Sequence, residues 1–181
     1  MVKHTQLSRL IIAAELAVGL AICSKMTIPI GLIPLTGQTL AVGLIASIVP
    51  PLVGTWAIGF YLLLGLIGLP VFAGSTAGLA ALFGPTGGYL WGFFLYIWIA
   101  GAFSKYTKQT PALIFGNIIG AVIQLLAGAY WLVLSANLSI TAAFNTGVMP
   151  FLIPGLVKVV LVVLAAKAIL RRLPQRFWLK N

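Results

Sequence analysis

This chain of 181 residues contains a single acidic residue, Glu15, and 61% of its residues are hydrophobic. Charged residues make up 7% of the sequence, whereas a soluble domain normally contains about 25%. Such an inventory cannot cover a folded surface with groups that interact well with water. Most of the surface must therefore face lipid, and the sequence predicts an all-α integral membrane protein.

Six apolar segments are predicted to cross the membrane, since a helix needs roughly 20 mainly apolar residues to span the bilayer core. Their approximate bounds are residues 7–24, 40–53, 55–69, 87–103, 111–135 and 148–170. The second and third are short, and Pro50, Pro51 and Gly54 separate them. These two are either tilted, partly buried spans or one re-entrant pair. The whole chain, residues 1–181, is predicted to form one membrane domain.

Basic residues indicate the orientation of these spans. Nine of the eleven lie in three places, which are Lys3 and Arg9, then Lys105 and Lys108, and finally Lys167, Arg171, Arg172, Arg176 and Lys180. With six spans, all three places lie on one side, which is therefore predicted to be cytoplasmic together with both termini. The opposite loops, residues 25–39, 70–86 and 136–147, contain one basic residue, Lys25. The net charge of +10 thus indicates orientation rather than nucleic-acid binding.

The inventory of reactive side chains argues against an enzyme. The chain has one carboxylate, one histidine (His4) and one cysteine (Cys23), so no carboxylate pair, metal cluster or catalytic triad can be assembled. A phosphate-binding loop motif is also missing, so this chain is not expected to hydrolyse ATP itself. Cys23 is interpreted as a small apolar filler of a helix. We expect binding or transport, without a metal or a cofactor.

Two of the loops on the predicted outer side have the composition of structured elements. In the first, two prolines restrict the backbone, and Thr36, Gln38 and Thr39 offer neutral hydrogen-bonding groups. In the second, over residues 68–89, repeated glycines allow the backbone to approach a ligand closely. Phe72 and Phe83 should be buried, which argues against a flexible surface loop. We therefore expect two structured extracellular loops over a ligand pocket.

Lys158 lies within the last apolar segment, where an ammonium group costs roughly 2.5–3.5 kcal/mol on insertion scales. Three explanations are open: a pair with Glu15, a bound anionic ligand, or a side chain that extends towards water. Glu15 lies within the first span, and it either reaches the interface or pairs with a basic residue of another helix. Asn117 is expected to make an interhelical hydrogen bond. Gln124 either packs between helices or contacts a ligand.

Small residues recur along the first span. Ala13, Ala17 and Ala21 follow one another every four residues, so they form a smooth face on one side of the helix. Another helix can approach such a face closely. On its own, the pattern is weak support for a partner protein.

Three segments resemble the BioY family, the biotin-specific substrate-binding (S) components of energy-coupling factor (ECF) transporters. They are residues 34–42, read PLTGQTLAV, residues 61–74, read YLLLGLIGLPVFAG, and residues 84–93, read GPTGGYLWGF. The resemblance is specific over residues 34–93 and continues in register to Lys158. It implies six spans, an outward-facing pocket for biotin, and a location in a prokaryotic plasma membrane. It also implies a membrane coupling subunit and two cytoplasmic ATPases, which use the ATP. The stripe of Ala13, Ala17 and Ala21 would then dock the coupling subunit.

The resemblance also bears on the site residues. In the family, the sixth span carries an Asp-x-x-Lys pair at the ligand; Lys158 matches the lysine, but Gly155 stands in place of the aspartate. Lys158 is therefore left without a local counter-ion, which favours direct contact with the ligand. The predicted ligand-binding residues are Lys158, Gln38, Thr39, Phe72, Gly74, Ser75, Gly78, Tyr89 and Gln124. The alternatives are a stand-alone secondary transporter of biotin or a similar small carboxylate, and a membrane scaffold without a ligand.

Overall fold

A bundle of helices forms the body of the protein. The structure, a computed structural model, describes residues 2–106 and 109–172. Within this range the longer helices are α1 (Val2–Ser24), α2 (Gln38–Ile48), α3 (Pro51–Leu66), α5 (Gly87–Tyr106), α6 (Thr110–Ser135) and α8 (Leu152–Arg172). The short elements are β1 (Thr27–Ile28), β2 (Leu35–Thr36), η1 (Ala73–Ser75), α4 (Gly78–Phe83), α7 (Ile140–Gly147) and η2 (Met149–Phe151). The predicted all-helical class is confirmed, apart from the two short antiparallel strands, in which Thr27 is paired with Thr36.

Proline and a polar cap set several of the helix boundaries. Pro51 occupies the first turn of α3 and Pro111 that of α6, where the missing N–H of proline breaks no helical hydrogen bond. Pro50, which directly precedes α3, has an extended backbone and separates α3 from α2. At the start of α7, the Ser139 hydroxyl accepts a hydrogen bond from the backbone N–H of Ala142 (3.2 Å).

The lengths of the helices divide them into two groups. Four described segments are long and apolar enough to cross a membrane: Gln6–Ser24, Gly87–Ser104, Thr110–Ser135 and Ile140–Arg172. Helices α2 and α3 are equally apolar but contain only 11 and 16 residues. At 1.5 Å per residue they extend over about 17 and 24 Å, less than the roughly 30 Å of a bilayer core. The count of six spans therefore stays a prediction.

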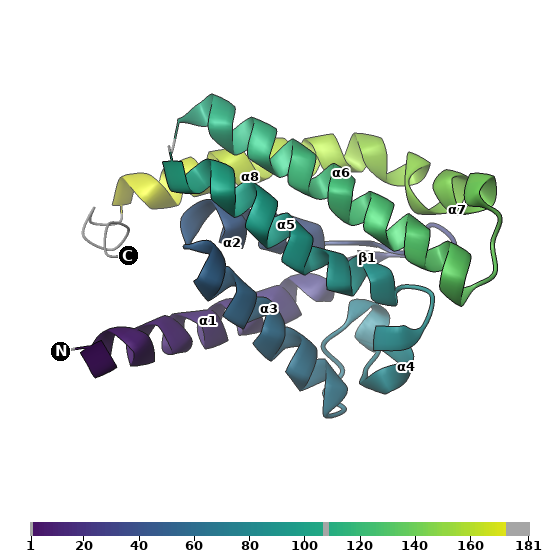
Figure 1. Ribbon diagram of the computed structural model, residues 1–181, viewed down its shortest axis with the longest axis horizontal. Helices are drawn as coiled ribbons and strands as arrows, with labels where there is room; N and C mark the ends of the chain where they lie inside the picture. Colours follow the sequence, from purple (N-terminus) through teal and green to yellow (C-terminus); the bar gives the residue numbers. More distant parts are fainter. Residues whose placement is uncertain (1, 107–108, 173–181) are drawn as a thin grey trace.

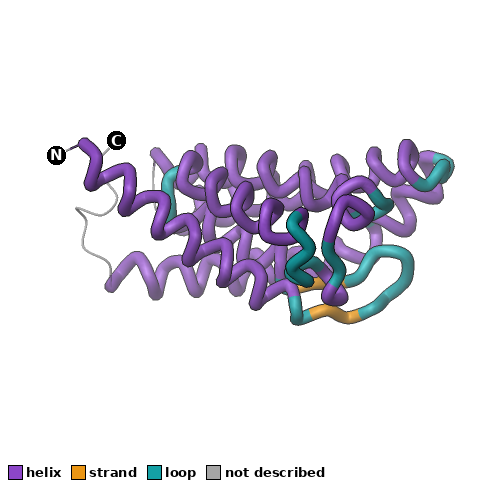
Figure 2. The backbone as a smooth tube through the Cα atoms, turned by 90° about the horizontal axis from the view of Figure 1, so that it is seen from below, coloured by secondary structure: helices purple, strands orange, loops and turns teal. Residues whose placement is uncertain are grey.

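The two ends of the bundle differ in what they carry. Figures 1 and 2 show the start of α1 and the end of α8 at one end of the bundle, and the strands, α4, α7 and most loops at the other. Arg9 lies near the start of α1, and Lys167, Arg171 and Arg172 lie in the last turns of α8, so these basic residues lie at the same end of the bundle. Lys108, Arg176 and Lys180 lie outside the described residues. We refer below to the end with α4 and α7 as the loop end.

Helices α5 and α6 lie side by side (Figure 1) because glycine allows their backbones to approach. A Cβ atom on Gly120 of α6 would lie 2.6 Å from a ring carbon of Tyr96 in α5. On Gly128 it would lie 2.3 Å from the ring of Tyr89. The two glycines thus make room for two buried tyrosines, as small residues do at interhelical contacts in membranes.

The small-residue stripe of α1 faces inwards. Ala13 and Ala17 are buried in the main hydrophobic core, while Ala21 is half-buried against it. Helix α1 packs on α2 and α3. The prediction that Ala13 and Ala17 dock a partner subunit is therefore wrong for this structure, because the bundle itself occupies this face. The spacing of small residues does indicate close packing, but the partner is another helix of the same chain.

Candidate functional site

A largely apolar cavity of about 240 Å³ lies at the loop end. This is slightly below the roughly 300–1,000 Å³ of typical ligand pockets, so it suits a compact small molecule. Residues of both structured loops and of α2, α4, α5, α6, η2 and α8 line it. The lining residues are Ile33, Pro34, Leu35, Thr36, Gln38, Thr39, Phe72, Ala73, Thr76, Ala81, Thr86, Tyr89, Leu90, Phe93, Tyr96, Ala121, Gln124, Leu125, Phe151, Gly155 and Lys158.

Lys158 provides the positive charge of the cavity wall. Its ammonium group donates hydrogen bonds to the backbone oxygen of Thr36 (2.6 Å) and to the hydroxyl of Thr39 (2.7 Å). These partners belong to β2 and to the first turn of α2, so the amine faces the first loop rather than Glu15, which is exposed on α1. An ammonium group has three N–H donors, and these two bonds leave one donor for a group inside the cavity.

Gln38 is buried at the start of α2, and both ends of its amide are hydrogen-bonded. Its Oε1 accepts from the Thr36 hydroxyl (2.9 Å), and its Nε2 donates to the hydroxyl of Tyr61. Tyr61 in turn donates to the backbone oxygen of Val71 (3.0 Å), in the second loop. Gln38 therefore connects the first loop, through α3, to the second.

Tyr89 and Gln124 form the wall on the α5–α6 side. The Tyr89 hydroxyl donates to the backbone oxygen of Gly147 (2.9 Å), at the end of α7. The Gln124 Nε2 donates to the backbone oxygen of Tyr89 (3.2 Å). The Gln124 Oε1 is buried and has no hydrogen-bond partner within the described part of the chain. Since buried polar atoms are normally paired, this oxygen is a candidate acceptor for a donor group of a ligand.

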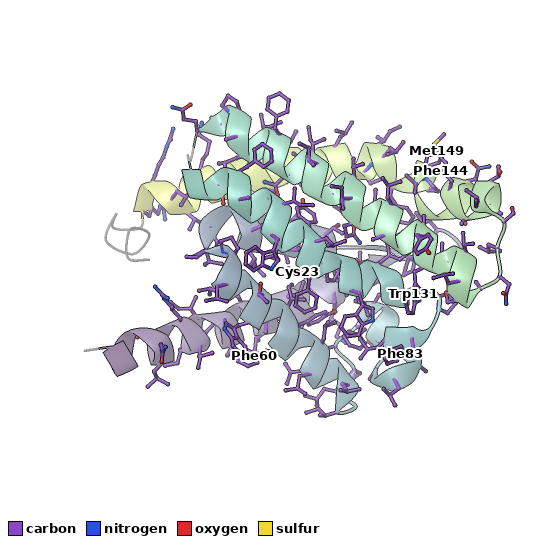
Figure 3. The ribbon with its side chains drawn as sticks, viewed as in Figure 1. Cys23, Phe60, Phe83, Trp131, Phe144 and Met149 are labelled. Atoms are coloured by element: carbon purple, nitrogen blue, oxygen red, sulfur yellow. The ribbon has the colours of Figure 1, made fainter. Side chains whose placement is uncertain are left out.

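Phe72 supplies an apolar wall from the second loop. Its ring is 1% exposed and packs edge-on against Tyr61, with ring centroids 5.3 Å apart. The ring also rests on Gly65 of α3, where a Cβ atom would lie 1.9 Å from a ring carbon. Only a residue without a side chain fits at position 65, so α3 fixes Phe72 in the wall. Phe83 was also expected to be buried, but it is 56% exposed and lies near Trp91, at the edge of the bundle (Figure 3).

Three predicted ligand-binding residues lie outside the cavity lining: Gly74, Ser75 and Gly78. They shape the second loop instead, since all three have positive φ angles, of 63°, 63° and 79°. The N–H of Gly74 donates to the Thr27 hydroxyl (3.4 Å), and the Ser75 hydroxyl accepts from Lys25 (3.1 Å). Lys25 also contacts the backbone oxygen of Pro70. These bonds join the second loop to the first, and a left-handed serine is strained unless its surroundings hold it.

Two tryptophans hold α4 at the edge of the cavity. The indole N–H of Trp91, in α5, donates to the backbone oxygen of Leu82 (3.1 Å). The indole of Trp131 extends from α6 (Figure 3) and donates to the backbone oxygen of Gly84 (2.9 Å). Both acceptors lie at the carboxyl end of α4, where backbone oxygens have no helical partner.

Sequence reasoning identified the polar part of this wall and missed most of the apolar part. Lys158, Gln38, Thr39, Phe72, Tyr89 and Gln124 line the cavity as expected from their positions in the sequence. Leu90, Phe93, Leu125 and Phe151 were not singled out, because an apolar residue has no distinctive signal in so hydrophobic a chain. Two further residues could have been found from the sequence. Thr36 is a polar residue close to the predicted ligand residue Gln38, and Tyr61 carries a hydroxyl within an apolar helix.

Taken together, these observations define a multi-pass helical membrane protein with a largely apolar cavity at one end. A sequence profile of the BioY family matches residues 1–175. The chain therefore belongs to the BioY family.

Curated relatives cover most of the chain. The "Biotin transporter BioY2" of Lactococcus lactis subsp. cremoris is 40% identical over 175 residues, which are 94% of this chain and 94% of that protein. The "Probable biotin transporter BioY" of Pyrococcus horikoshii is 34% identical and covers 80% of this chain and 85% of its own length. The "Biotin transporter BioY" of Thermotoga maritima is 35% identical and covers 78% of this chain and 83% of its own length. Because these relatives are named as transporters, the prediction that the chain is not an enzyme is confirmed.

The fold also matches a solved structure. The S-component for biotin from an ECF-type ABC transporter superimposes with a TM-score of 0.88, covering 99% of this chain and 100% of that chain, at 23% sequence identity. This chain therefore has the fold of that S-component. Together with the apolar helices, these comparisons identify a multi-pass protein of the cell membrane.

Proposed function

We propose that this protein is the biotin-binding S component of an ATP-driven ECF importer. It captures biotin from outside the cell and delivers it together with a membrane coupling subunit and two cytoplasmic ATPases. Membership of the BioY family, relatives named as biotin transporters, and the fold of a biotin S-component support this proposal.

The position of Lys158 is the observation that carries the proposal. The amine belongs to the wall of a cavity whose lining contains no carboxylate among the described residues. A cation in such a place is favoured by an anionic partner, and biotin has one carboxylate. Helix α2 begins beside the amine, and its N-cap residue, Gly37, has no side chain to cap it. The helix dipole therefore adds to the positive potential there. We place the carboxylate of biotin at Lys158.

The rest of the cavity suits the rest of the ligand. Phe72, Leu90, Phe93 and Phe151 offer apolar surface for the fused rings and the hydrocarbon chain. Gln124 carries an acceptor that has no partner among the described residues, which suits an N–H of the ureido group. A few polar anchors in an apolar wall are typical of sites for small molecules.

The proposed topology places this cavity on the outer side. We propose six spans, in which α2 and α3 are short, largely internal crossings, with both termini in the cytoplasm. The described basic residues at the end with the termini support this orientation. Biotin would then enter from the loop end.

Isothermal titration of the purified protein with biotin tests the proposal. Wild-type protein should bind one biotin per chain, and Lys158→Ala should weaken binding by about 10- to 100-fold. This follows from about 1.5–3 kcal/mol for a hydrogen bond to a charged group. Lys167→Ala is the matched control, because this lysine lies on the same helix but donates to Thr110, away from the cavity. Unchanged affinity of Lys158→Ala would remove the amine from the site.

Uptake into proteoliposomes separates the proposal from a stand-alone secondary transporter. Biotin uptake should require the coupling subunit, both ATPases and ATP. Uptake that persists without them and collapses with the proton gradient would favour the alternative.

A further inference from the structure

Tyr61 lies behind the cavity wall and joins two segments that contribute residues to it. The side chain is fully buried in α3 and is not part of the cavity lining. Its hydroxyl accepts a hydrogen bond from Gln38 and donates one to the backbone oxygen of Val71. One hydroxyl group thus connects the start of α2 with the second loop.

The ring of Tyr61 acts on the same part of the loop. Phe72 directly follows Val71, and its ring meets the Tyr61 ring at an interplanar angle of 77°. Tyr61 therefore restrains both the backbone before Phe72 and the orientation of the Phe72 ring. Edge-to-face packing of this kind stabilises a defined orientation.

The other side of the connection leads to Lys158. The Gln38 amide accepts from the Thr36 hydroxyl, and the backbone oxygen of Thr36 accepts from Lys158. The orientation of the amide is fixed at both ends, so the Tyr61 hydroxyl determines where the Gln38 side chain lies. Without that hydroxyl, a buried N–H of Gln38 loses its acceptor, and the amide is free to turn.

We propose that Tyr61 is a positioning residue for biotin: its hydroxyl holds Gln38 and Phe72 in the geometry that retains the bound ligand. This inference rests on the proposed function and adds to it a residue that does not touch the ligand. Its main effect is on the dissociation rate, because a wall that is held in place must open before the ligand can leave.

Tyr61→Phe tests the inference, since it removes the hydroxyl and keeps the ring against Phe72. Val71 retains a donor in the hydroxyl of Ser24, so the loop should stay folded. We expect biotin to dissociate about 5- to 20-fold faster, because a buried N–H of Gln38 loses its acceptor, as measured by displacement of labelled biotin from protein in nanodiscs. The association rate should change by less than twofold.

Ser104→Ala is the control for a general loss of stability. The Ser104 hydroxyl is also buried, and its single donor is shared between the backbone oxygens of Ala46 and Gly101, but it lies away from the cavity. It should lower the unfolding temperature without a change in the dissociation rate. An equal acceleration in both variants would overturn the inference, and so would a Tyr61→Phe protein that does not fold.

A double-mutant cycle with Gln38→Leu locates the effect in the hydrogen bond. If the two side chains act together, the acceleration in the double variant should be smaller than the product of the two single accelerations. Effects that multiply would contradict the inference. Wild-type protein that binds no biotin would instead refute the proposed function, so the two failures are distinguishable.

Discussion

Two polar clusters in the interior of this protein differ in whether all of their hydrogen-bond donors have acceptors within the protein. The core cluster comprises Ser47, Tyr96 and Asn117, from three helices. Asn117 accepts from the Tyr96 hydroxyl (3.2 Å) and donates to the Ser47 hydroxyl (2.9 Å) and to the backbone oxygen of Leu113 (2.7 Å). The Ser47 hydroxyl donates to the backbone oxygen of Gly43 (2.8 Å). Each donor of this cluster is used within the bundle.

The cavity cluster comprises Thr36, Gln38, Tyr61 and Lys158. It joins α2, α3 and α8 to both structured loops, and its hydrogen bonds leave one N–H of Lys158 for the cavity. A fully paired cluster stabilises one arrangement of helices. A cluster with an unused charged donor at a cavity wall can bind a ligand. Tyr96 also lines the cavity, but its hydroxyl donates to Asn117 inside the bundle. We infer that the hydrogen bonds of the core cluster hold the helices together, and that those of the cavity cluster serve the proposed binding of the ligand.

The largest expected effect on biotin affinity comes from a substitution in α3 that displaces Phe72 from the cavity wall. Gly65→Ala would place a methyl group where the ring of Phe72 now lies. Phe72 must then move out of the wall, and overpacking of this kind typically costs about 1–3 kcal/mol. We expect biotin affinity to fall by about tenfold to more than a hundredfold, measured by isothermal titration.

The matched control for this change is Gly59→Ala. It lies on the same helix, and a methyl group there would have no atom within 4 Å. Its affinity should equal that of the wild type. Equal loss of affinity in both variants would mean that the integrity of α3, rather than the position of Phe72, determines binding.

A smaller effect on biotin affinity is expected when the hydrogen bonds of the core cluster are removed. Asn117→Leu leaves the buried hydroxyls of Ser47 and Tyr96 without their amide partner, at a cost of about 1–3 kcal/mol of stability. The unfolding temperature should fall, as followed by tryptophan fluorescence. Because the ring of Tyr96 also lines the cavity, the biotin dissociation constant should rise, but by less than in Gly65→Ala. A large loss of affinity with unchanged stability would reverse the roles assigned to the two clusters.

The positions of the long helices could be predicted because apolar runs and their breaks carry most of the information. Pro111 marks a helix start both in the sequence and in the structure. The third segment was predicted to begin at residue 55, but α3 already begins at Pro51, because proline fits the first turn of a helix. Helices α4 and α7 were expected to be parts of loops, since six and eight residues are too few for a distinct helical pattern. Their positions depend on tertiary contacts, such as those of Trp91 and Trp131 with the end of α4.

The polar part of the site could be predicted for a related reason. Lys158, Gln38 and Gln124 stand out in an apolar sequence because burying them requires a partner. Whether a given helix face packs inside the bundle or lies on its surface could not be predicted in the same way. Ala13 and Ala17 have the spacing of a contact surface, but spacing alone does not say whether the contact is with the same chain or another.

The most direct test of the account compares biotin with its methyl ester, in wild-type protein and in Lys158→Ala, by isothermal titration. The ester keeps the rings and the chain but has no negative charge. Wild-type protein should bind the ester at least about tenfold more weakly than biotin, because the charged hydrogen bond is lost, and Lys158→Ala should bind both ligands alike. Equal affinity of the wild type for the two ligands, or a preference for biotin that persists in Lys158→Ala, would contradict the placement of the carboxylate at Lys158.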